Sequence, residues 1–143
     1  MTNCYLTSLR YENYLVLRDN GFNVIAFNER SQLADKLKKG DMIFIYIGSR
    51  VSKIVGYVRV KQECYWDTKL LWDDIFPKRV RIEPISVVND NNGIHVKNLV
   101  EQLSFVKNKS RYGMSFMAGL RQIPQEDATI LVEQIESRIK NEL

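Results

Sequence analysis

The run Asp41-Met42-Ile43-Phe44-Ile45-Tyr46-Ile47 decides the fold of this chain of 143 residues. After the aspartate every residue is apolar or aromatic, which is typical of a strand buried on both faces. The next apolar stretch, residues 53–65, alternates instead. One side carries Ile54, Gly56, Val58 and Val60, and the other carries Val55, Tyr57, Arg59 and Lys61. We therefore predict that the centre of the chain is β.

Shorter elements flank these two strands. Further strands are predicted at residues 3–7, 23–27 and 78–88, and Pro84 places the last of them at an edge or a bulge. Helices are predicted at residues 10–20, where Gly21 caps the C-terminal end, and at residues 32–39 and 96–103. A last helix after Pro124 carries the apolar stripe Ala128, Leu131, Val132, Ile135 and Ile139. Strands of this length around one core tend to close, so the expected fold is α+β, a single domain over residues 1–143 with a small β-barrel of about five or six strands flanked by short helices.

Composition and charge limit the classes of function. The chain is 45% hydrophobic and 27% charged with a net charge of +4, as in an ordinary globular domain that tolerates a polyanionic partner. Cys4 and Cys64 lack a CxxC spacing, and His95 has no partner at ligand or triad spacing. We therefore expect reduced thiols, no metal and no cofactor. No apolar run reaches the roughly 18 residues of a membrane span, and no signal peptide is recognised, so a cytoplasmic protein is expected.

A basic segment follows the β region. Between Glu101 and Glu126 there is no acidic residue, and the cations are interleaved with aromatic rings at Phe105, Tyr112 and Phe116. This pattern favours a polyanion that also presents flat bases. We predict phosphate contacts from Lys107, Lys109, Arg111 and Arg121, with Arg79 as a further candidate. The alternatives are a solvated basic loop, a strand-surface charge at Arg79, and an ion pair of Arg121 with Glu126 or Asp127.

An ordered set of short motifs resembles the EVE domain, in its archaeal-type branch. The set begins with Asn13-Tyr14, residues 27–30, Lys39-Gly40-Asp41 and Tyr46. It continues through residues 54–60, 65–67 and 77–80 and ends with residues 105–109 and 121–127. The resemblance implies a PUA-like mixed β-barrel, related to YTH and ASCH domains, with a C-terminal helix. It also implies a concave pocket that admits a nucleobase, often a modified one, and a reader without chemistry of its own.

A base reader needs flat side chains for stacking and polar groups that read the base edge. At positions that the resemblance places near the pocket, the stacking candidates are Tyr14, Phe27 and Trp66, with Tyr65 in reserve. Tyr14 stands where relatives commonly have tryptophan, and Phe27 where many bacterial members have arginine. The edge-reading candidates are Thr7, Ser8, Asn28, Asp67 and backbone groups between Tyr46 and Gly48. For the aromatic residues the alternative is core packing, and for Asn28 it is a helix N-cap.

Three classes of function follow from these residues. The first is a non-catalytic module that binds DNA or RNA, from a monomer or a homodimer, and reads a modified, in particular methylated, or flipped-out base. The second is a small-ligand or protein-interaction module that binds a free nucleobase or nucleotide. The third is an ASCH-like ribonuclease, against which stand the lack of paired histidines and of a Ser/His/Asp set.

Overall fold

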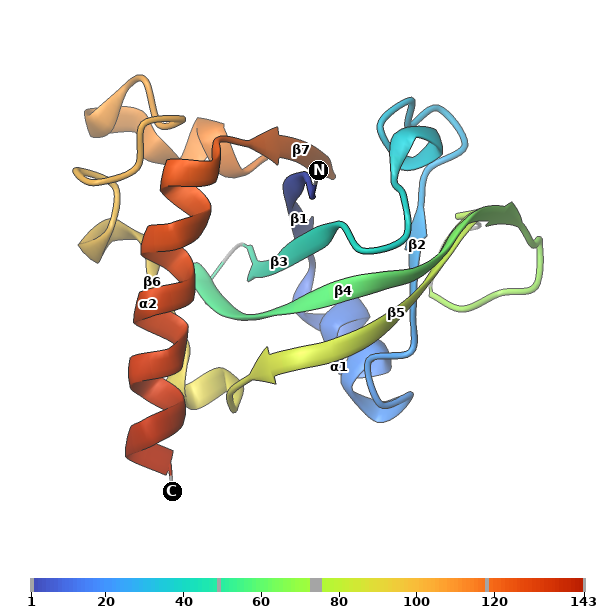
Figure 1. Cartoon of the computed structure of the whole chain (residues 1–143), viewed down its shortest axis with the longest axis horizontal. Coiled ribbons are helices and arrows are strands. Elements are labelled where there is room, and N and C mark those ends of the chain that lie inside the picture. The colour runs from blue at the N-terminus through green and yellow to red at the C-terminus, as the bar shows by residue number, and fades with distance from the viewer. Residues whose placement is uncertain (1, 49, 73–75, 118, 143) are drawn as a thin grey trace.

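A curled mixed sheet forms the framework of the protein (Figure 1). The computed structural model describes residues 2–48, 50–72, 76–117 and 119–142. The strands, in the order in which they lie in the sheet, are β2 (Val24–Phe27), β5 (Lys78–Val87), β4 (Lys53–Trp66), β3 (Met42–Ile47), β1 (Cys4–Leu9) and β7 (Leu120–Ile123), and β6 (Ile94–His95) pairs with β4. β1 and β3 are parallel, and the other pairs are antiparallel. The predicted α+β class with a small mixed barrel and a C-terminal helix is confirmed.

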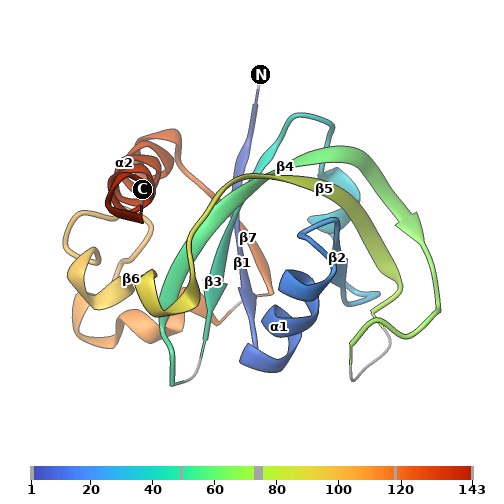
Figure 2. The same cartoon turned by 90° about the horizontal axis from the view of Figure 1, so that it is seen from below.

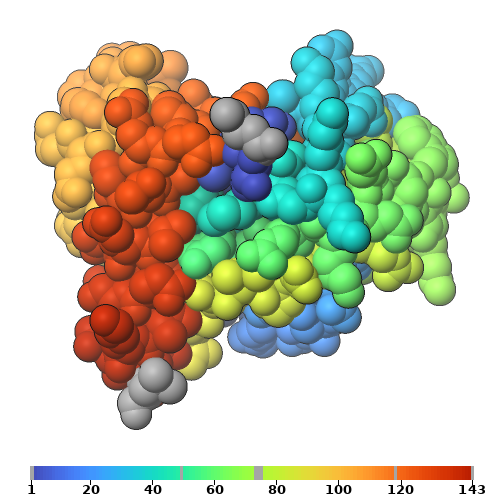
Figure 3. Space-filling model, viewed as in Figure 1, coloured from blue at the N-terminus to red at the C-terminus, as the bar shows by residue number. Residues whose placement is uncertain are grey.

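Helices cover both faces of the sheet. α1 (Tyr11–Asp19) lies on the concave side, whereas α2 (Gln125–Glu142) and β6 lie beyond the other face (Figure 2). The space-filling view shows α2, in orange to red, lying directly against β5 (Figure 3). Short 3-10 helices complete the chain at η1 (Ala34–Lys36), η2 (Asp90–Asn92), η3 (Val96–Asn98) and η4 (Lys109–Phe116).

β3 separates two hydrophobic cores, as its sequence predicts. Ile43, Ile45 and Ile47 face the concave core, which also contains Tyr14 and Leu17 of α1. Phe44 and Tyr46 face the second core, which α2 and the chain between β6 and β7 complete. Because side chains alternate across a strand, one short apolar run can supply both layers.

The alternation predicted for β4 is broken by a bulge. The register with β3 shifts so that Gly56 pairs with Ile45 and Ile54 with Tyr46. Val55 therefore joins Val58 on the concave face, while Ile54 joins Tyr57 on the other. A Cβ atom at Gly56 would lie 2.3 Å from the carbonyl oxygen of Ser86, so the close approach of β5 requires glycine there. Pro84 also lies at a register shift, which confirms the bulge predicted for it.

Two predicted helices are shorter than expected, and two short strands, β6 and β7, were not predicted. The helix expected over residues 96–103 is only the turn η3, and the helix over residues 32–39 is only η1. Residues 99–103 instead make backbone turns with i→i−3 hydrogen bonds, and the Nζ atom of Lys109 donates to the carbonyls of Val100 and Leu103 at 2.7 and 2.8 Å. β7 was missed because its four residues carry only a short apolar signal between the basic segment and Pro124.

The two ends of the sheet border the same region. β2 and β7 terminate the strand order and do not pair with each other within the described strands. The end of β2 and the start of β7 instead line a common cavity together with the end of β1. The partly closed barrel thus presents an opening between its edge strands.

Candidate functional site

The first cavity occupies this opening and has a volume of about 600 Å³. Its lining comes from every element around the opening: residues 7–10 at the end of β1, Asn13 of α1, residues 26–28 and 30–33 around the end of β2, Trp72 and Phe76 before β5, and residues 119–120 before β7. A volume in this range suits a small organic ligand.

Aromatic rings form the apolar part of the first cavity. Phe27 and Trp72 are 5% and 7% exposed, and Phe76 is half-buried. The rings of Trp72 and Phe76 meet edge to face, with centroids 5.5 Å apart and planes at 77°. Phe27 was predicted at this site, whereas Trp72 and Phe76 were not. The aromatic side chains therefore provide two walls at nearly a right angle against a flat ligand.

Two polar groups in the first cavity lack a protein partner. Asn13 is 5% exposed, and its side-chain amide makes no hydrogen bond with the described residues. The Nε1 atom of Trp72 is buried and has no acceptor within the part of the chain that the structure describes. Buried polar atoms are nearly always hydrogen-bonded in folded proteins, and Trp72 Nε1 is an exception among the described residues. Trp72 Nε1 and the Asn13 amide can therefore pair with a ligand that presents complementary polar atoms.

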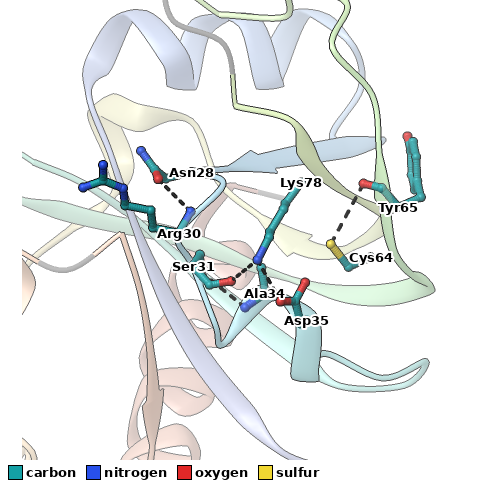
Figure 4. A network of polar contacts seen from close by, with 8 residues as sticks. All are labelled: Asn28, Arg30, Ser31, Ala34, Asp35, Cys64, Tyr65 and Lys78. Carbon is teal, nitrogen blue, oxygen red and sulfur yellow. Dashed lines mark hydrogen bonds and ion pairs between the residues drawn. The ribbon is translucent and has the colours of Figure 1, made fainter.

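Thr7, Ser8 and Asn28 line the first cavity, as predicted for edge readers. The hydroxyls of Thr7 and Ser8 donate to the carbonyls of Gly119 and Phe116, each at 2.6 Å, so toward a ligand they can act only as acceptors. Asn28 Oδ1 accepts from the backbone N–H of Arg30 at 2.9 Å, which closes a turn rather than capping a helix (Figure 4). The Asn28 amide nitrogen remains as a donor.

A second cavity of about 400 Å³ adjoins the first. It contains Tyr46 and Gly48, both predicted as base-binding positions, together with Ser52, Gly113, Phe116 and Met117. Ser8, Leu9 and Arg10 line both cavities. Six of the ten base-binding positions predicted from the sequence thus line these two neighbouring cavities.

The remaining aromatic candidates lie elsewhere. Tyr14 is 1% exposed and packs in the concave core, where burial raises its pKa to about 12. Tyr65, Trp66 and Asp67 lie at the far end of β4 and line neither cavity. Arg81 stacks over the ring of Tyr65, and Trp66 is 61% exposed. The predicted socket between Tyr14 and Trp66 is therefore replaced by one between Phe27 and Trp72.

Three of the five predicted phosphate-binding cations are engaged inside the protein. Arg79, expected at the surface, is 4% exposed, and its guanidinium donates to the carbonyls of Phe76 and Lys69. Lys109 binds the two carbonyls described above. Arg121 donates to the carbonyl of Ser115 at 3.0 Å and lies over the ring of Phe105, so it pairs with neither Glu126 nor Asp127. These three side chains stabilise loops, which corrects the expectation that they are available for phosphate.

Other cations are better placed. Lys107 and Arg111 are exposed, and their side chains make no hydrogen bond or ion pair among the described residues. Arg10 and Arg30 line the first cavity, although the sequence did not single them out. Figure 4 shows the Arg30 side chain extending away from the Lys78–Asp35 ion pair. The positive charge therefore lies at the cavity as well as on the basic segment.

The family model of the EVE domain matches residues 8–134. The chain belongs to the EVE domain family. An archaeal UPF0310 protein from Pyrococcus horikoshii is 28% identical over 135 residues, covering 84% of this chain and 90% of its own. A UPF0310 protein from Saccharolobus solfataricus is 26% identical over 153 residues, covering 96% and 97%. The predicted family and its archaeal-type branch are thereby confirmed.

Solved structures share the fold of this EVE domain. The Mmi1 YTH domain superposes with a TM-score of 0.71 at 15% identity, covering 98% of this chain and 78% of its own. The same domain solved in complex with RNA gives a TM-score of 0.71 at 14% identity, covering 99% and 82%. Protein Atu2648 from Agrobacterium tumefaciens gives 0.64 at 15% identity, covering 93% and 92%. At these identities the likeness establishes the PUA-like, YTH-related fold alone.

The described ranges hold neither a metal-ligand cluster nor a helix fit to span a membrane. No group of three or more histidine, cysteine, aspartate or glutamate side chains there has the geometry to hold a metal ion. None of the helices described is both long and apolar enough to span a bilayer.

Proposed function

We propose that this EVE domain is a non-catalytic nucleic-acid-binding module that receives one unstacked base, in particular a methylated base, in the first cavity. The observation that carries this proposal is the combination of aromatic walls with two polar groups that have no partner among the described residues, the Asn13 amide and Trp72 Nε1. The fold shared with the Mmi1 YTH domain, which was solved in complex with RNA, supports the choice of a nucleic acid. RNA and DNA are both candidate ligands.

Each wall of the cavity has a role in this proposal. Phe27 and Trp72 contact the faces of the base, an interaction that contributes about 1–3 kcal/mol per base. The amide of Asn13 offers a donor and an acceptor to the base edge, and Trp72 Nε1 donates to a ring nitrogen or an oxo group. A methyl group buried against the rings adds about 0.8 kcal/mol, or about fourfold in affinity. Arg10 and Arg30 attract the flanking phosphates.

Intrinsic fluorescence tests the position of the base directly. The chain has two tryptophans, and Trp66 is exposed outside both cavities, so Trp66→Phe leaves Trp72 as the only reporter. Titration of this variant with methylated and unmethylated adenosine and cytidine should quench the emission of Trp72. The methylated nucleoside should saturate at the lower concentration. Emission that no nucleoside changes, with a folded protein, contradicts the proposal.

A matched pair of asparagine variants tests edge reading. Asn13→Ala removes an amide that has no partner among the described residues and places a strong helix former in α1, so the fold should persist. Binding should weaken by about 0.5–1.5 kcal/mol, which corresponds to about 2- to 13-fold. The control Asn141→Ala lies on the exposed surface of α2 and should bind as the wild type does. Equal affinity of all three proteins removes Asn13 from the site.

One observation favours a second function, the binding of a free nucleotide. Arg79, Lys109 and Arg121 are engaged in internal contacts, which leaves fewer cations for a long polyanion than the sequence predicts. The two functions differ in their response to chain length. A nucleic-acid reader binds a methylated oligonucleotide more tightly than the matching nucleoside monophosphate, in single-stranded or duplex RNA or DNA. A free-nucleotide site binds the monophosphate at least as tightly, because the cavity alone supplies the affinity.

A further inference from the structure

We infer that the second cavity receives the nucleoside next to the one in the first cavity, so that the domain recognises a dinucleotide step rather than an isolated base. This inference rests on the proposed function of the first cavity. It assigns a binding role to Tyr46, Phe116 and Met117 that the first cavity does not require.

The two cavities share one wall. Ser8, Leu9 and Arg10 at the end of β1 line both of them. The segment before β7 is divided in the same way, because Gly119 lines the first cavity whereas Met117 lines the second. The two cavities therefore adjoin at the end of β1.

The shared wall is held in a fixed position. The Thr7 and Ser8 hydroxyls donate to the carbonyls of Gly119 and Phe116, each at 2.6 Å. On the other side of β1, the backbone N–H of Gly48 donates to the carbonyl of Leu9 at 2.9 Å. These bonds connect β1 to the segments on both sides, so the spacing of the two hollows is preorganised for a ligand with two bases.

The second cavity contains the side chains that stack on a base. The rings of Tyr46 and Phe116 lie 4.8 Å apart with an interplanar angle of 32° and form an aromatic floor. Met117 is 78% exposed, and its thioether has almost no covering side chain. Gly48 and Gly113 add no side-chain bulk to the lining. A second base can therefore contact a ring on one side and a flexible, polarisable side chain on the other.

Charge at the wall fits the link between two nucleosides. Arg10 borders both cavities, where the phosphodiester of a bound dinucleotide crosses from one to the other. Arg111 is exposed and lies two residues before Gly113, which lines the second cavity. A planar guanidinium pairs well with two oxygens of a phosphate. Two bases and one connecting phosphate thus match the two hollows and the arginine between them.

Two glycines allow each cavity to be filled separately. A Cβ atom built on Gly113, in the second cavity, or on Gly119, in the first, meets no atom within 4 Å, and neither glycine has a positive φ. Gly113→Leu and Gly119→Leu should therefore both fold, which their thermal unfolding curves check. Met117→Ala is a third variant that shortens an exposed side chain and cannot disturb the core.

The decisive experiment compares a methylated nucleoside monophosphate with three dinucleotides: the methylated base in the 5′ position, in the 3′ position, and beside an abasic sugar. Of the two dinucleotides that carry two bases, one should bind about tenfold more tightly than the monophosphate. The dinucleotide with the abasic sugar should bind no more tightly than the monophosphate. Gly113→Leu and Met117→Ala should reduce the gain without changing monophosphate binding. Gly119→Leu should weaken the binding of both ligands.

The outcomes separate this inference from the proposed function. If the monophosphate binds but no dinucleotide binds more tightly, or if Gly113→Leu and Met117→Ala leave the gain intact, the second cavity is not a nucleoside site. The proposed function survives that result. If neither the monophosphate nor any dinucleotide binds, the proposed function fails and this inference fails with it.

Discussion

The hydroxyl of Ser8 donates a hydrogen bond of 2.6 Å to the carbonyl of Phe116, a residue 108 positions later in the chain. Thr7 makes the equivalent bond to Gly119 across 112 positions. The end of β1 is thereby joined to η4 and to the start of β7, and the basic segment acquires a defined place beside the cavities. Side-chain bonds of this kind order a chain region that has no long helix or strand of its own.

Loss of the Ser8 hydroxyl should loosen η4. We expect Ser8→Ala to lower the free energy of unfolding by about 1 kcal/mol, because the carbonyl of Phe116 loses its donor. Hydrogen exchange of the amides in Lys109–Phe116 should become faster. Ser110→Ala is the control, since its exposed hydroxyl contacts only Asn108. Unchanged protection of η4 in Ser8→Ala, measured by mass spectrometry, contradicts this role.

Lys78 should hold the loop that forms the outer wall of the first cavity. Its Nζ atom donates to the carbonyl of Ser31 at 2.9 Å and pairs with Asp35 at 2.7 Å (Figure 4). Lys78→Met keeps most of the stem but removes both bonds, so stability should fall by about 1–2 kcal/mol and exchange in residues 28–36 should rise. The exposed Lys36→Met in the same loop is the control. Ligand affinity should fall only in Lys78→Met, and equal effects of the two variants refute the role.

The sequence predicts the elements that packing determines. The unbroken apolar run of β3 indicates burial on both faces, and its side chains accordingly divide between the two cores. Phe27, Thr7 and Ser8, which were predicted as base-binding positions, all line the first cavity. The roles that they and the second-cavity positions have in binding remain predictions.

The sequence pattern does not show which of the two tryptophans lies at the first cavity. Trp66 and Trp72 both lie near the same irregular linker, where no periodicity shows which ring turns inward. Trp66 ends β4 in solvent, whereas Trp72 returns to the opening of the barrel. Which of the two tryptophans is buried depends on contacts between distant parts of the chain.

The environments of two cations and one carboxylate could not be predicted from the sequence either. Arg79 and Lys109 resemble surface charges in the sequence, yet both side chains donate hydrogen bonds to backbone carbonyls. Asp127 is fully buried and accepts the backbone N–H groups of Ser104 and Phe105, each at 2.9 Å. Such bonds join residues with no regular spacing, so charge patterns alone overestimate the free positive surface.

Burial of Tyr14 should make the protein sensitive to high pH. Its pKa is raised from 10.0 to about 12, chiefly because burial disfavours the phenolate. The unfolded chain therefore loses this proton first, and the contribution to stability, complete below pH 10, is lost as the pH rises toward 12. The loss approaches about 1.4 kcal/mol per pH unit. Tyr14→Phe should lose less stability between pH 9 and pH 11 than the wild type in urea titrations. An equal loss in both proteins contradicts the shifted pKa.

The salt dependence of nucleic-acid affinity should report how many cations contact the nucleic acid. Arg10 and Arg30 line the first cavity, and Arg111 is an exposed cation of the basic segment. Three phosphate contacts from these residues predict a slope of log affinity against log salt of about −2 for a single strand. Arg30→Gln and Arg111→Gln should each reduce the slope by about 0.7 because each removes one phosphate contact. Lys140→Gln changes the net charge equally, but this exposed residue lies in the last turn of α2, and it should leave the slope unchanged. Fluorescence anisotropy at several salt concentrations measures the slope. If Lys140→Gln lowers it as much as the arginine variants do, diffuse net charge rather than the cavity rim attracts the strand.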